Sequence, residues 1–443
     1  MNPTRCTLSD LLDRAPADKV AIILPEQNIR STYAALRGQV QAVAEQLAAA
    51  GISRGDRVGI ALPNGLPMVV SFLAAAAAGT AAPLNPLYKE DEFRFHLEDT
   101  EARVLILPPG GAEDARRAAG GRVPILTIDM NAAGTVSLSG VSGRKAVRLP
   151  AVDDVALVLH TSGSAGRPKR VPLAHANLSI SAGNMAKSYA LGPTDVALCV
   201  MPLFHAHGLV ASALATFGSG GTVVVPARFS PLSFWRVARD HGVTWYSAVP
   251  TLHQLLLARA AAPTSRKPAG TERLRFIRSC GASLPPRLLH ALEAAFGAPV
   301  VEAYGMTEAA HHVASNPLPP AVRKPGSVGR GSDVRISIMN EEGRHLPPGE
   351  RGEVVIQGAN VIRGYENDAA ANATSFVDGW FRTGDRGYLD ADGYLWLVAG
   401  SRNYQSRRRE NLATRTRRSA ARESRRAQDV DAAAEGVSYA LKT

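Results

Sequence analysis

One short run of small and hydroxylated residues has the composition of a polyphosphate-binding loop. It follows the apolar stretch Val155–Leu159, which predicts a buried strand. Glycines let the backbone approach a ligand closely, successive N–H groups can converge on an anion, and hydroxyl groups add donors. A lysine ends the run and supplies a mobile positive charge. The candidate phosphate-binding residues are Thr161, Ser162, Gly163, Ser164, Gly166 and Lys169.

The same run is also compatible with an ordinary Gly/Ser turn beside an unrelated surface lysine. It is not a Walker A loop, because Arg170 rather than Ser or Thr follows Lys169 and the glycine spacing differs. The phosphate interpretation therefore depends on what other motifs the chain carries.

Two imidazoles, His205 and His207, lie two positions apart just after an apolar segment. This spacing can chelate a metal, but no third ligand stands nearby in the sequence. Taken alone, the pair is better interpreted as structural histidines.

Two further motifs carry carboxylates beside hydroxyl groups or turns. In Glu302–Glu308, Thr307 precedes the final carboxylate, and Tyr304 could stack on a base. A carboxylate next to a hydroxyl suits a Mg²⁺–polyphosphate complex, because Mg²⁺ takes few protein ligands and keeps its waters. Asp385, at the end of Trp380–Asp385, could accept hydrogen bonds from two ribose hydroxyls.

The elements that must position these motifs alternate along the chain from about Leu8 to Val398. Ser31–Ala50 has apolar residues at helical spacing, and Arg57–Leu62, Val104–Leu107 and Thr222–Val225 are short apolar strands. This alternation predicts α/β layers with largely parallel sheets.

Two segments have a different character. Met68–Pro83 is apolar but too short to span a membrane, and it predicts a buried helix leading into a strand. Residues 330–398 contain the strictly alternating Val334–Ile338 and the strand Gly352–Ile356, with Gly and Pro between them. This part predicts a small β-rich subdomain or barrel.

Composition and charge narrow the class of protein. The net charge is +11, but residues 401–443 hold ten Arg and one Lys against three Glu and two Asp, so this tail carries +6 of it. A nucleic-acid partner is therefore not expected. No apolar run reaches membrane-spanning length, and Met1–Arg5 lacks the charged-then-apolar layout expected of a signal peptide. Cys6, Cys199 and Cys280 lack paired or metal-ligand spacing, which fits a reduced, cytoplasmic setting.

Five motifs in a distinctive order make the chain resemble the adenylate-forming superfamily, acyl-CoA synthetases in particular. They are the loop ending at Lys169, Pro202–His205, Gly281–Leu284, Tyr304–Glu308 and Trp380–Asp385. The resemblance covers residues 8–398 and implies the AMP-binding N-terminal domain of these enzymes, with two layered α/β subdomains and a small β-rich subdomain. It implies that ATP and a carboxylate form an acyl-adenylate and pyrophosphate, after which the thiol of CoA attacks. A small carboxylic acid, ATP, Mg²⁺ and coenzyme A are the implied substrates and cofactors.

The resemblance also implies roles for individual residues. Those that would hold the β- and γ-phosphates are Thr161, Ser162, Gly163, Ser164 and Lys169. Those that would form the adenine slot are Gly281, Ala282 and Tyr304. Thr307 would contact the α-phosphate, Glu308 would bind Mg²⁺ and Asp385 would bind the ribose. His205 would line the acyl tunnel near the reacting carboxylate, so Thr307, Glu308 and His205 are the catalytic candidates.

The acyl pocket contains unusually polar candidates. Ala309–His312 follow Glu308, Ile277–Cys280 precede the adenine slot, and His207 lies beside His205. If these converge, the pocket is short, polar and partly cationic. An apolar acyl chain would leave its buried polar groups unpaired, whereas a small dicarboxylate would satisfy them.

The strings Phe276–Cys280 and Ser315–Pro319 are similar to those of oxalate–CoA ligases. Oxalate is therefore the favoured substrate, with His207, Ser279 and His311 as candidate contacts. The alternatives are that some of these histidines are core or surface residues, and that the acid is another small or medium-chain one.

After Val398 the family pattern stops. The family continues with a hinge and a C-terminal lid domain of about a hundred residues that carries a lysine assisting adenylation. That lid is expected to be missing, since Lys442 has no matching context. Residues 399–443 predict a basic, disordered tail. It is either an evolved arm for nucleic acid or acidic surfaces or, as favoured, the product of a frameshift, because suitable synonymous codons for Gln405–Gln428, read in a shifted frame, give a family-like segment.

Two functions of different class follow. The first is an acyl-CoA synthetase that retains binding of ATP, Mg²⁺ and a small acid but is impaired by truncation. The second is a non-catalytic nucleotide-binding protein, or a nucleic-acid-binding protein that uses the basic tail. The sequence leaves the oligomeric state open.

Overall fold

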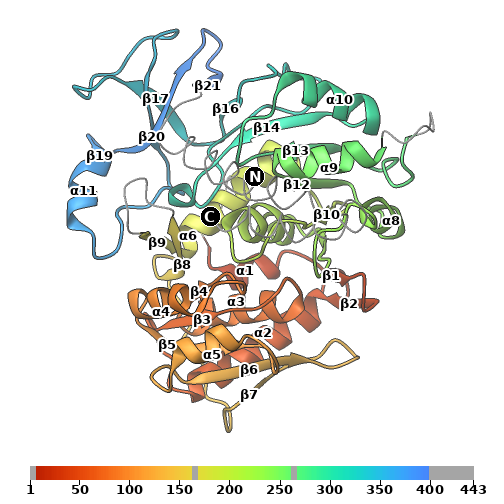
Figure 1. The fold of residues 1–443 in the computed structure, drawn as a ribbon, viewed down its shortest axis with the longest axis vertical. Helices are drawn as coiled ribbons and strands as arrows, with labels where there is room; N and C mark the ends of the chain where they lie inside the picture. The colour runs from red at the N-terminus through yellow and green to blue at the C-terminus, as the bar shows by residue number, and fades with distance from the viewer. Residues whose placement is uncertain (1–5, 162–167, 261–266, 399–443) are drawn as a thin grey trace, which may run out of the picture.

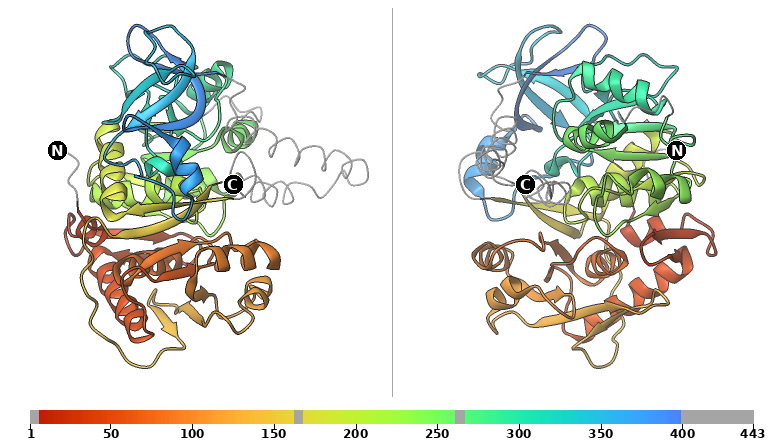
Figure 2. Two further views of the ribbon diagram at one scale, coloured as in Figure 1. Left: turned by 90° about the vertical axis from the view of Figure 1, so that its left-hand side faces the viewer. Right: turned by 45° about the vertical axis from the view of Figure 1, so that its right-hand side comes forward.

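Two large mixed sheets and one small sheet make up the molecule (Figure 1). The computed structural model describes residues 6–161, 168–260 and 267–398. In both views of Figure 2 the seven-stranded sheet with its helices lies at one end and the small sheet at the other, with the nine-stranded sheet between them. The predicted α/β layers with a small β-rich part are confirmed.

The seven-stranded sheet has the strand order β7-β6-β5-β3-β4-β8-β9 and is parallel except at its two edges. Its strands are β3 (Arg57–Ile60), β4 (Thr80–Pro83), β5 (Ala102–Leu107), β6 (Ile125–Met130), β7 (Val136–Ser139), β8 (Val155–Thr161) and β9 (Lys169–Ala174). The helices packed on it are α2 (Tyr33–Ala49), α3 (Leu66–Ala78), α4 (Glu90–Asp99) and α5 (Glu113–Ala119). Ile106 joins the core on the α2–α3 side and Leu107 the core on the α4–α5 side, so β5 is buried on both faces.

Local signals explain where the first long helices begin. The hydroxyl of Thr32 accepts a hydrogen bond from the amide of Ala35 at 3.1 Å, so the helix predicted over Ser31–Ala50 begins at Tyr33. The helix and strand predicted over Met68–Pro83 are α3 and β4, as expected. Within the described ranges, no helix is both long and apolar enough to cross a membrane.

The nine-stranded sheet has the order β16-β15-β14-β13-β12-β10-β11-β1-β2, with a parallel centre and antiparallel edges. Its strands are β1 (Val20–Leu24), β2 (Ile29–Thr32), β10 (Val196–Leu198), β11 (Thr222–Val224), β12 (Trp245–Ala248), β13 (Phe276–Ser279), β14 (Val300–Tyr304), β15 (Ala314–Ser315) and β16 (Arg330–Gly331). The helices of this part are α1 (Leu8–Leu12), α6 (His175–Ser188), the π-helix η1 (His207–Leu214), α7 (Ala215–Gly218), α8 (Phe234–Asp240), α9 (Pro250–Ala260), α10 (Pro286–Phe296) and the 3₁₀ turn η2 (Thr307–Ala309).

The alternation of β13 separates two functional side chains. Phe276 packs into the core that contains α6, and Ile277 packs into the core that contains α8–α10. Because successive strand residues point to opposite faces, Arg278 lies on the α6 side and Ser279 on the other.

The small sheet is antiparallel, with the order β17-β18-β20-β19 and with β21 paired to β20. Its elements are β17 (Arg335–Met339), β18 (Gly352–Gln357), α11 (Ala369–Ser375), β19 (Phe376–Val377), β20 (Trp380–Leu389) and β21 (Leu395–Leu397). The strands predicted at Val334–Ile338 and Gly352–Ile356 are β17 and β18. Several sequence predictions lie outside the described residues: those for Ser162, Gly163, Ser164, Gly166 and the tail 399–443.

Candidate active site

Thr161 and Lys169, the described ends of the predicted phosphate loop, lie opposite each other in a β-hairpin. Strands β8 and β9 pair antiparallel, and the Cα atoms of Thr161 and Lys169 are partners in that register. The sequence predicted only the strand before the loop. The pairing fixes the two positions from which the loop residues depart.

Charged side chains brace the base of this hairpin. The Nε atom of Arg170 lies 3.4 Å from Oδ2 of Asp99, the last residue of α4, and His160 Nε2 lies 3.0 Å from the same oxygen. Arg57 donates to both carboxylate oxygens of Glu366 at 3.0 Å. Arg170 also lies 3.9 Å from Glu366. Arg170, the residue after Lys169, therefore connects β9 with α4 through Asp99 and with β3 through Glu366 and Arg57.

Tyr365 links the lysine of this hairpin to the candidate Mg²⁺ carboxylate. Lys169 Nζ lies 4.6 Å from the centre of the Tyr365 ring, and the Tyr365 hydroxyl donates to Oε1 of Glu308 at 2.8 Å. Burial and the neighbouring Glu308 carboxylate raise the pKa of Tyr365, which keeps its hydroxyl a donor. Glu308 is 6% exposed and follows Thr307 on η2. One carboxylate beside a hydroxyl at a polyphosphate site fits a Mg²⁺ ion that keeps most of its waters.

A cavity opens at the carboxyl ends of β13 and β14. The Tyr304 hydroxyl donates to Oδ2 of Asp385 at 2.7 Å across it. Its lining residues are Ser279, Gly281, Ala282, Ser283, Leu284, Glu302, Ala303, Tyr304, Gly305, Gly326, Val328, Asp385 and Leu397. Gly281 has a φ of +88°, a left-handed conformation that favours glycine. The cavity therefore brings together all the residues predicted for the adenine slot and the ribose.

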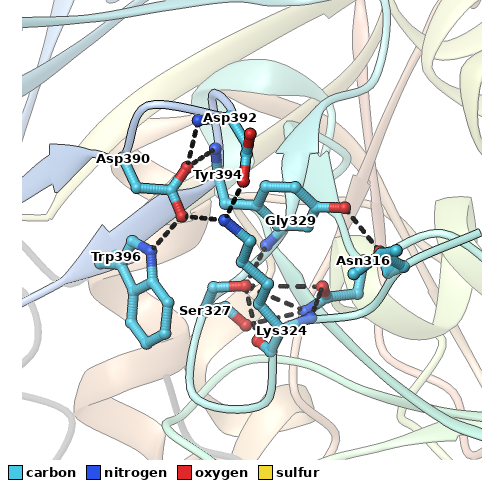
Figure 3. A network of polar contacts seen from close by, with 9 residues as sticks. Asn316, Lys324, Ser327, Gly329, Asp390, Asp392, Tyr394 and Trp396 are labelled. Atoms are coloured by element: carbon cyan, nitrogen blue, oxygen red, sulfur yellow. Dashed lines mark hydrogen bonds and ion pairs between the residues drawn. The ribbon is translucent and has the colours of Figure 1, made fainter. Parts of the chain in front are cut away.

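A polar network lies around the segment that carries the lining residues Gly326 and Val328 (Figure 3). Lys324 Nζ donates to Oδ2 of Asp390 at 2.6 Å and to Oδ2 of Asp392 at 2.7 Å, and Trp396 Nε1 donates to the same oxygen of Asp390 at 3.1 Å. Partial burial raises the pKa of Asp390, but the hydrogen bonds from Lys324 and its neighbours outweigh burial and leave it below its usual value. This segment is tied to the small sheet in this way, because Lys324 lies two residues before Gly326, a lining residue.

Glu302, another lining residue of the cavity, contacts the same segment. Both of its carboxylate oxygens accept from the amide of Gly326 at 3.1 Å. Burial raises the pKa of Glu302 to about 7, partly offset by these hydrogen bonds. Glu302 therefore joins β14 to the segment that carries Gly326.

Arg278 is the centre of a buried polar cluster on the α6 side of β13. It is 0% exposed, and its guanidinium donates to Tyr189 Oη at 3.0 Å, Ser247 Oγ at 3.0 Å and His311 Nε2 at 3.2 Å. A fourth donor lies 3.4 Å from His312 Nδ1. Among the described residues, Arg278 makes no ion pair with a carboxylate. A positive charge is therefore buried here among neutral partners.

Two of the predicted histidines meet at the edge of this cluster. The rings of His207 and His311 are stacked, with centroids 4.9 Å apart and planes at 27°. His207 begins the π-helix η1, and its Nε2 lies 2.7 Å from Ser247 Oγ. Burial first, then the charge of Arg278, lowers the pKa of His207 well below its usual value.

The other two residues predicted for the acyl pocket, Ser279 and His205, have different surroundings. Ser279 is 2% exposed and lines the cavity, and its Oγ is buried without a hydrogen-bond partner in the described part of the chain. His205 precedes η1 and packs beside Phe204, with ring centroids 4.6 Å apart. Ser279 thus offers an unused hydroxyl to a ligand in the cavity.

Three residues of the site were not sequence candidates. Tyr365 and Ser247 lie in segments without a recognised motif, and only the fold brings them to Glu308 and His207. Arg278 had a signal, because a charged residue inside the apolar strand Phe276–Ser279 needs a reason to be buried. Its partners, however, come from α6, β12 and the segment after η2, which no local pattern connects.

The sequence is similar to AMP-binding enzymes, among them several proteins named as CoA ligases. A family model described as "AMP-binding enzyme" matches residues 10–366. Oxalate–CoA ligase from Arabidopsis thaliana is 42% identical over 424 residues, which is 92% of this chain and 81% of that protein. Oxalate–CoA ligase from Saccharomyces cerevisiae is 38% identical, covering 90% and 79%. Sulfoacetate–CoA ligase from Cupriavidus necator is 37% identical, covering 90% and 78%.

Solved structures agree with the sequence matches. ATP-bound MatB from Rhodopseudomonas palustris superposes with a TM-score of 0.80 at 29% identity, covering 90% of this chain and 78% of that one. O-succinylbenzoate CoA synthetase (MenE) from Bacillus subtilis, in complex with ATP and magnesium ion, has a TM-score of 0.77 at 29% identity, covering 88% and 79%. Both comparisons cover about nine tenths of this chain and include proteins named as CoA ligases or CoA synthetases.

Proposed function

This chain belongs to the AMP-binding enzyme family, in which it is an ATP-dependent acid–CoA ligase, and we propose that its acid substrate is a small dicarboxylate, with oxalate favoured. The carrying observation is the buried polar cluster around Arg278, beside the cavity proposed for the nucleotide. The proposal also draws on relatives named for oxalate and sulfoacetate, two small acids with a second anionic group.

The nucleotide would lie in the cavity at the ends of β13 and β14. Gly281, Ala282 and Tyr304 are proposed to hold the adenine, with the left-handed turn at Gly281 allowing close backbone approach. Asp385, oriented by the Tyr304 hydroxyl, is proposed to accept the ribose hydroxyls.

The phosphates would extend toward the hairpin. Thr161 and Lys169 are proposed to hold the β- and γ-phosphates together with the sequence-predicted loop residues, and Thr307 would contact the α-phosphate. Glu308 is proposed to hold Mg²⁺, which would neutralise phosphate charge. Phosphoryl chemistry of this kind needs positioning and charge neutralisation more than covalent help. Holding Lys169 and Glu308 on either side of Tyr365 supplies that positioning.

The reaction would then proceed by two displacements. An oxygen of the acid attacks the α-phosphorus, the bond to pyrophosphate breaks, and an acyl-adenylate remains. The sulfur of CoA next attacks the acyl carbon, and AMP leaves. His205 is proposed to line the path of the reacting carboxylate.

The choice of acid follows from the cost of leaving buried polar groups unpaired. An alkyl tail would leave the buried Ser279 hydroxyl without a partner, at about 1–3 kcal/mol. A second carboxylate would accept from this hydroxyl, with His207 and His311 as further proposed contacts, and the buried positive charge of Arg278 on the other face of β13 would favour it. Sites that hydrogen-bond a substrate reject analogues lacking the group more strongly than apolar pockets do.

ATP–pyrophosphate exchange with single acids tests this proposal. We expect oxalate or malonate to exceed hexanoate in kcat/KM by at least about 100-fold. Free Mg²⁺ is held constant across the series, because oxalate chelates the ion. Best activity with hexanoate would refute the polar pocket.

A matched pair of serine variants locates the effect. Ser279→Ala should raise KM for the dicarboxylate, since it removes a buried hydroxyl that has no protein partner among the described residues. Ser71→Ala removes an equally buried and unpartnered hydroxyl on α3 and should leave KM unchanged. Equal effects of the two variants would argue against a substrate contact at Ser279.

A further inference from the structure

Three parts of the molecule meet at one short segment, residues 360–366, which we call the strap. It lies between β18 and α11 in the chain. Its beginning is bonded to the turn η2: Asn360 Nδ2 donates to the carbonyl of Ala309 at 2.7 Å, and the amide of Ile362 donates to the carbonyl of Glu308 at 2.8 Å. The strap therefore starts on the backbone that carries the proposed Mg²⁺ carboxylate.

The other end of the strap is bonded to the seven-stranded sheet. The amide of Glu366 donates to the carbonyl of Arg170 at 3.1 Å, directly beside Lys169 on β9. Both carboxylate oxygens of Glu366 accept from Arg57 of β3 at 3.0 Å, and the Arg170 guanidinium lies 3.9 Å away. The side chains of Glu366 and Arg170 are 17% and 8% exposed, so water and salt screen these charges less than they would on an open surface. A backbone bond and two partly buried ion pairs therefore fix this end.

A side chain from the small-sheet part holds Tyr365 within the strap. Asn372 lies on α11, which packs on β19 and β20. Its Oδ1 accepts from the amide of Tyr365 at 2.7 Å, and its Nδ2 donates to the carbonyl of Tyr365 at 2.9 Å. One carboxamide thus bonds both backbone polar groups of this tyrosine. The packing is close, because a Cβ at Gly364 would lie 3.3 Å from Asn372 Nδ2.

The side chain of Tyr365 reaches both proposed MgATP contacts from this fixed backbone. Lys169 Nζ lies 4.6 Å from the centre of its ring, and its hydroxyl donates to Glu308 Oε1 at 2.8 Å. Both contacts depend on where the ring lies, since a hydrogen bond weakens steeply as its angle departs from linear. A misplacement of about 1 Å in a reacting site can lower the rate roughly 100-fold. The anchors of the strap therefore determine how the lysine and the carboxylate face each other.

We propose that Asn372 and Glu366 are positioning residues for MgATP: they fix Tyr365 on the strap, and Tyr365 holds Lys169 and Glu308 at the separation that the polyphosphate and its metal ion need. This inference rests on the proposed function, which assigns the phosphates to Lys169 and Mg²⁺ to Glu308. Both positioning residues act through Tyr365 and not through a contact with the nucleotide. Glu366 adds a negative charge near a site for a polyanion, a cost that its anchoring role offsets.

The sign of the effect of Glu366→Gln separates anchoring from long-range charge. Removing a negative charge near the phosphates should tighten MgATP binding if the charge acted only at long range. The strap predicts the opposite, because Arg57 loses its carboxylate partner: the Kd for MgATP should rise about 3- to 10-fold in calorimetric titration with excess Mg²⁺ and no acid. Asp333→Asn is the matched control, since both oxygens of Asp333 accept from Lys187 at 2.8 and 2.7 Å, and it should leave the Kd unchanged. An unchanged or lowered Kd in Glu366→Gln would overturn the proposal.

A double-mutant cycle tests whether Asn372 acts through Tyr365. Asn372→Leu should raise the Kd for MgATP about 10-fold in the unaltered background. In Tyr365→Phe, whose ring no longer reaches Glu308 through a hydroxyl, the same change should raise it at most about threefold. Asn131→Leu is the control, because Asn131 also holds backbone amides, at 3.0 and 2.9 Å in the turn between β6 and β7, and it should leave the Kd unchanged. Equal factors for Asn372→Leu in the two backgrounds would show a merely structural role and overturn the proposal.

The inference and the proposed function fail in different ways. The titration contains no acid, so its outcome does not depend on which acid is the substrate. If Lys169→Ala and Glu308→Gln leave the Kd for MgATP unchanged, the phosphate and metal assignments of the proposed function fail, and this inference fails with them. If those two variants weaken binding while Glu366→Gln and Asn372→Leu do not, the strap inference alone is overturned. If Asn372→Leu does not fold by circular dichroism, Asn372→Asp carries the cycle, since it keeps the acceptor for the Tyr365 amide and loses only the donor to its carbonyl.

Discussion

Removing the hydroxyl group of Tyr365 should weaken the binding of MgATP. Tyr365→Phe deletes the donor that reaches Glu308 Oε1 at 2.8 Å but keeps the ring under Lys169. A hydrogen bond to a charged group contributes about 1.5–3 kcal/mol. We therefore expect kcat/KM for ATP to fall roughly 10- to 100-fold in ATP–pyrophosphate exchange.

A second variant separates the two contacts of this ring. Tyr365→Leu also removes the contact with Lys169 Nζ at 4.6 Å, which at a partly exposed site contributes about 0.5–1 kcal/mol. Its kcat/KM should fall a further two- to fivefold, as roughly expected from that energy. Because the raised pKa of Tyr365 keeps it protonated, the ratio between the unaltered protein and Tyr365→Phe should not vary with pH.

Tyr33→Phe is the matched control. Tyr33 is also a buried tyrosine with a hydrogen-bonded hydroxyl, which donates to the carbonyl of Gly221 at 2.7 Å. It should lose similar stability in thermal unfolding without losing kcat/KM for ATP. The reasoning is wrong if Tyr365→Phe keeps the kcat/KM and the Mg²⁺ dependence of the unaltered protein.

Three other perturbations have defined outcomes. Gly305→Ala should abolish pyrophosphate exchange, because the added Cβ would lie 1.6 Å from the carbonyl oxygen of His311. As the control, Gly38→Ala in α2 meets nothing within 4 Å and should stabilise the fold by about 0.5–1 kcal/mol in urea unfolding. An active Gly305→Ala protein would contradict the close approach at Gly305. Lys324→Met should raise KM for ATP roughly 3- to 10-fold and leave KM for the acid unchanged, since it breaks the hydrogen bond between Asp390 and the segment that carries Gly326. Equal changes in both KM values would show that this segment is not specific to ATP. Burial lowers the pKa of His96 to about 3 and those of His175 and His253 to about 4, so the unfolded chain binds more protons below pH 6.5 and stability falls as the pH decreases. Each histidine should cost roughly 1.4 kcal/mol between pH 7.5 and pH 5.5, and urea unfolding with equal stability at the two values would count against their burial as neutral groups.

Local sequence patterns were sufficient for most of the elements and for the residues proposed to hold the nucleotide. The Thr32 cap, the almost entirely apolar α3 and the alternation of β17 are properties of neighbouring residues, so the sequence predicts them well. Gly281, Ala282, Tyr304 and Asp385 could be predicted because each belongs to a short motif, at the end of β13 or β14 or, for Asp385, within β20. The β8–β9 pairing was missed because an antiparallel return after the loop has no signal in an apolar run.

For the proposed acid pocket, the sequence predicted only which polar residue types would be present, not how they contact one another. The sequence identified polar residues at Ile277–Cys280, His207 and His311, but the contacts among them depend on which faces of β12 and β13 turn toward η1. The hydrogen bond between His207 and Ser247 joins residues 40 positions apart, and that between Tyr365 and Glu308 joins residues 57 positions apart. Such long-range hydrogen bonds arise from tertiary packing alone. These contacts, rather than the motifs, carry the inferences about specificity.

Competition between acids tests the central claim most directly. The unaltered full chain is incubated with ATP, Mg²⁺, hydroxylamine and an equimolar mixture of oxalate, malonate, sulfoacetate and hexanoate, and the hydroxamates trapped from the acyl-adenylates are measured by mass spectrometry. Product ratios in one vessel give ratios of kcat/KM. We expect the hydroxamate of oxalate to dominate and that of hexanoate to be at most about 1% of it. A product mixture dominated by the hexanoate derivative would contradict a polar acid pocket centred on Arg278.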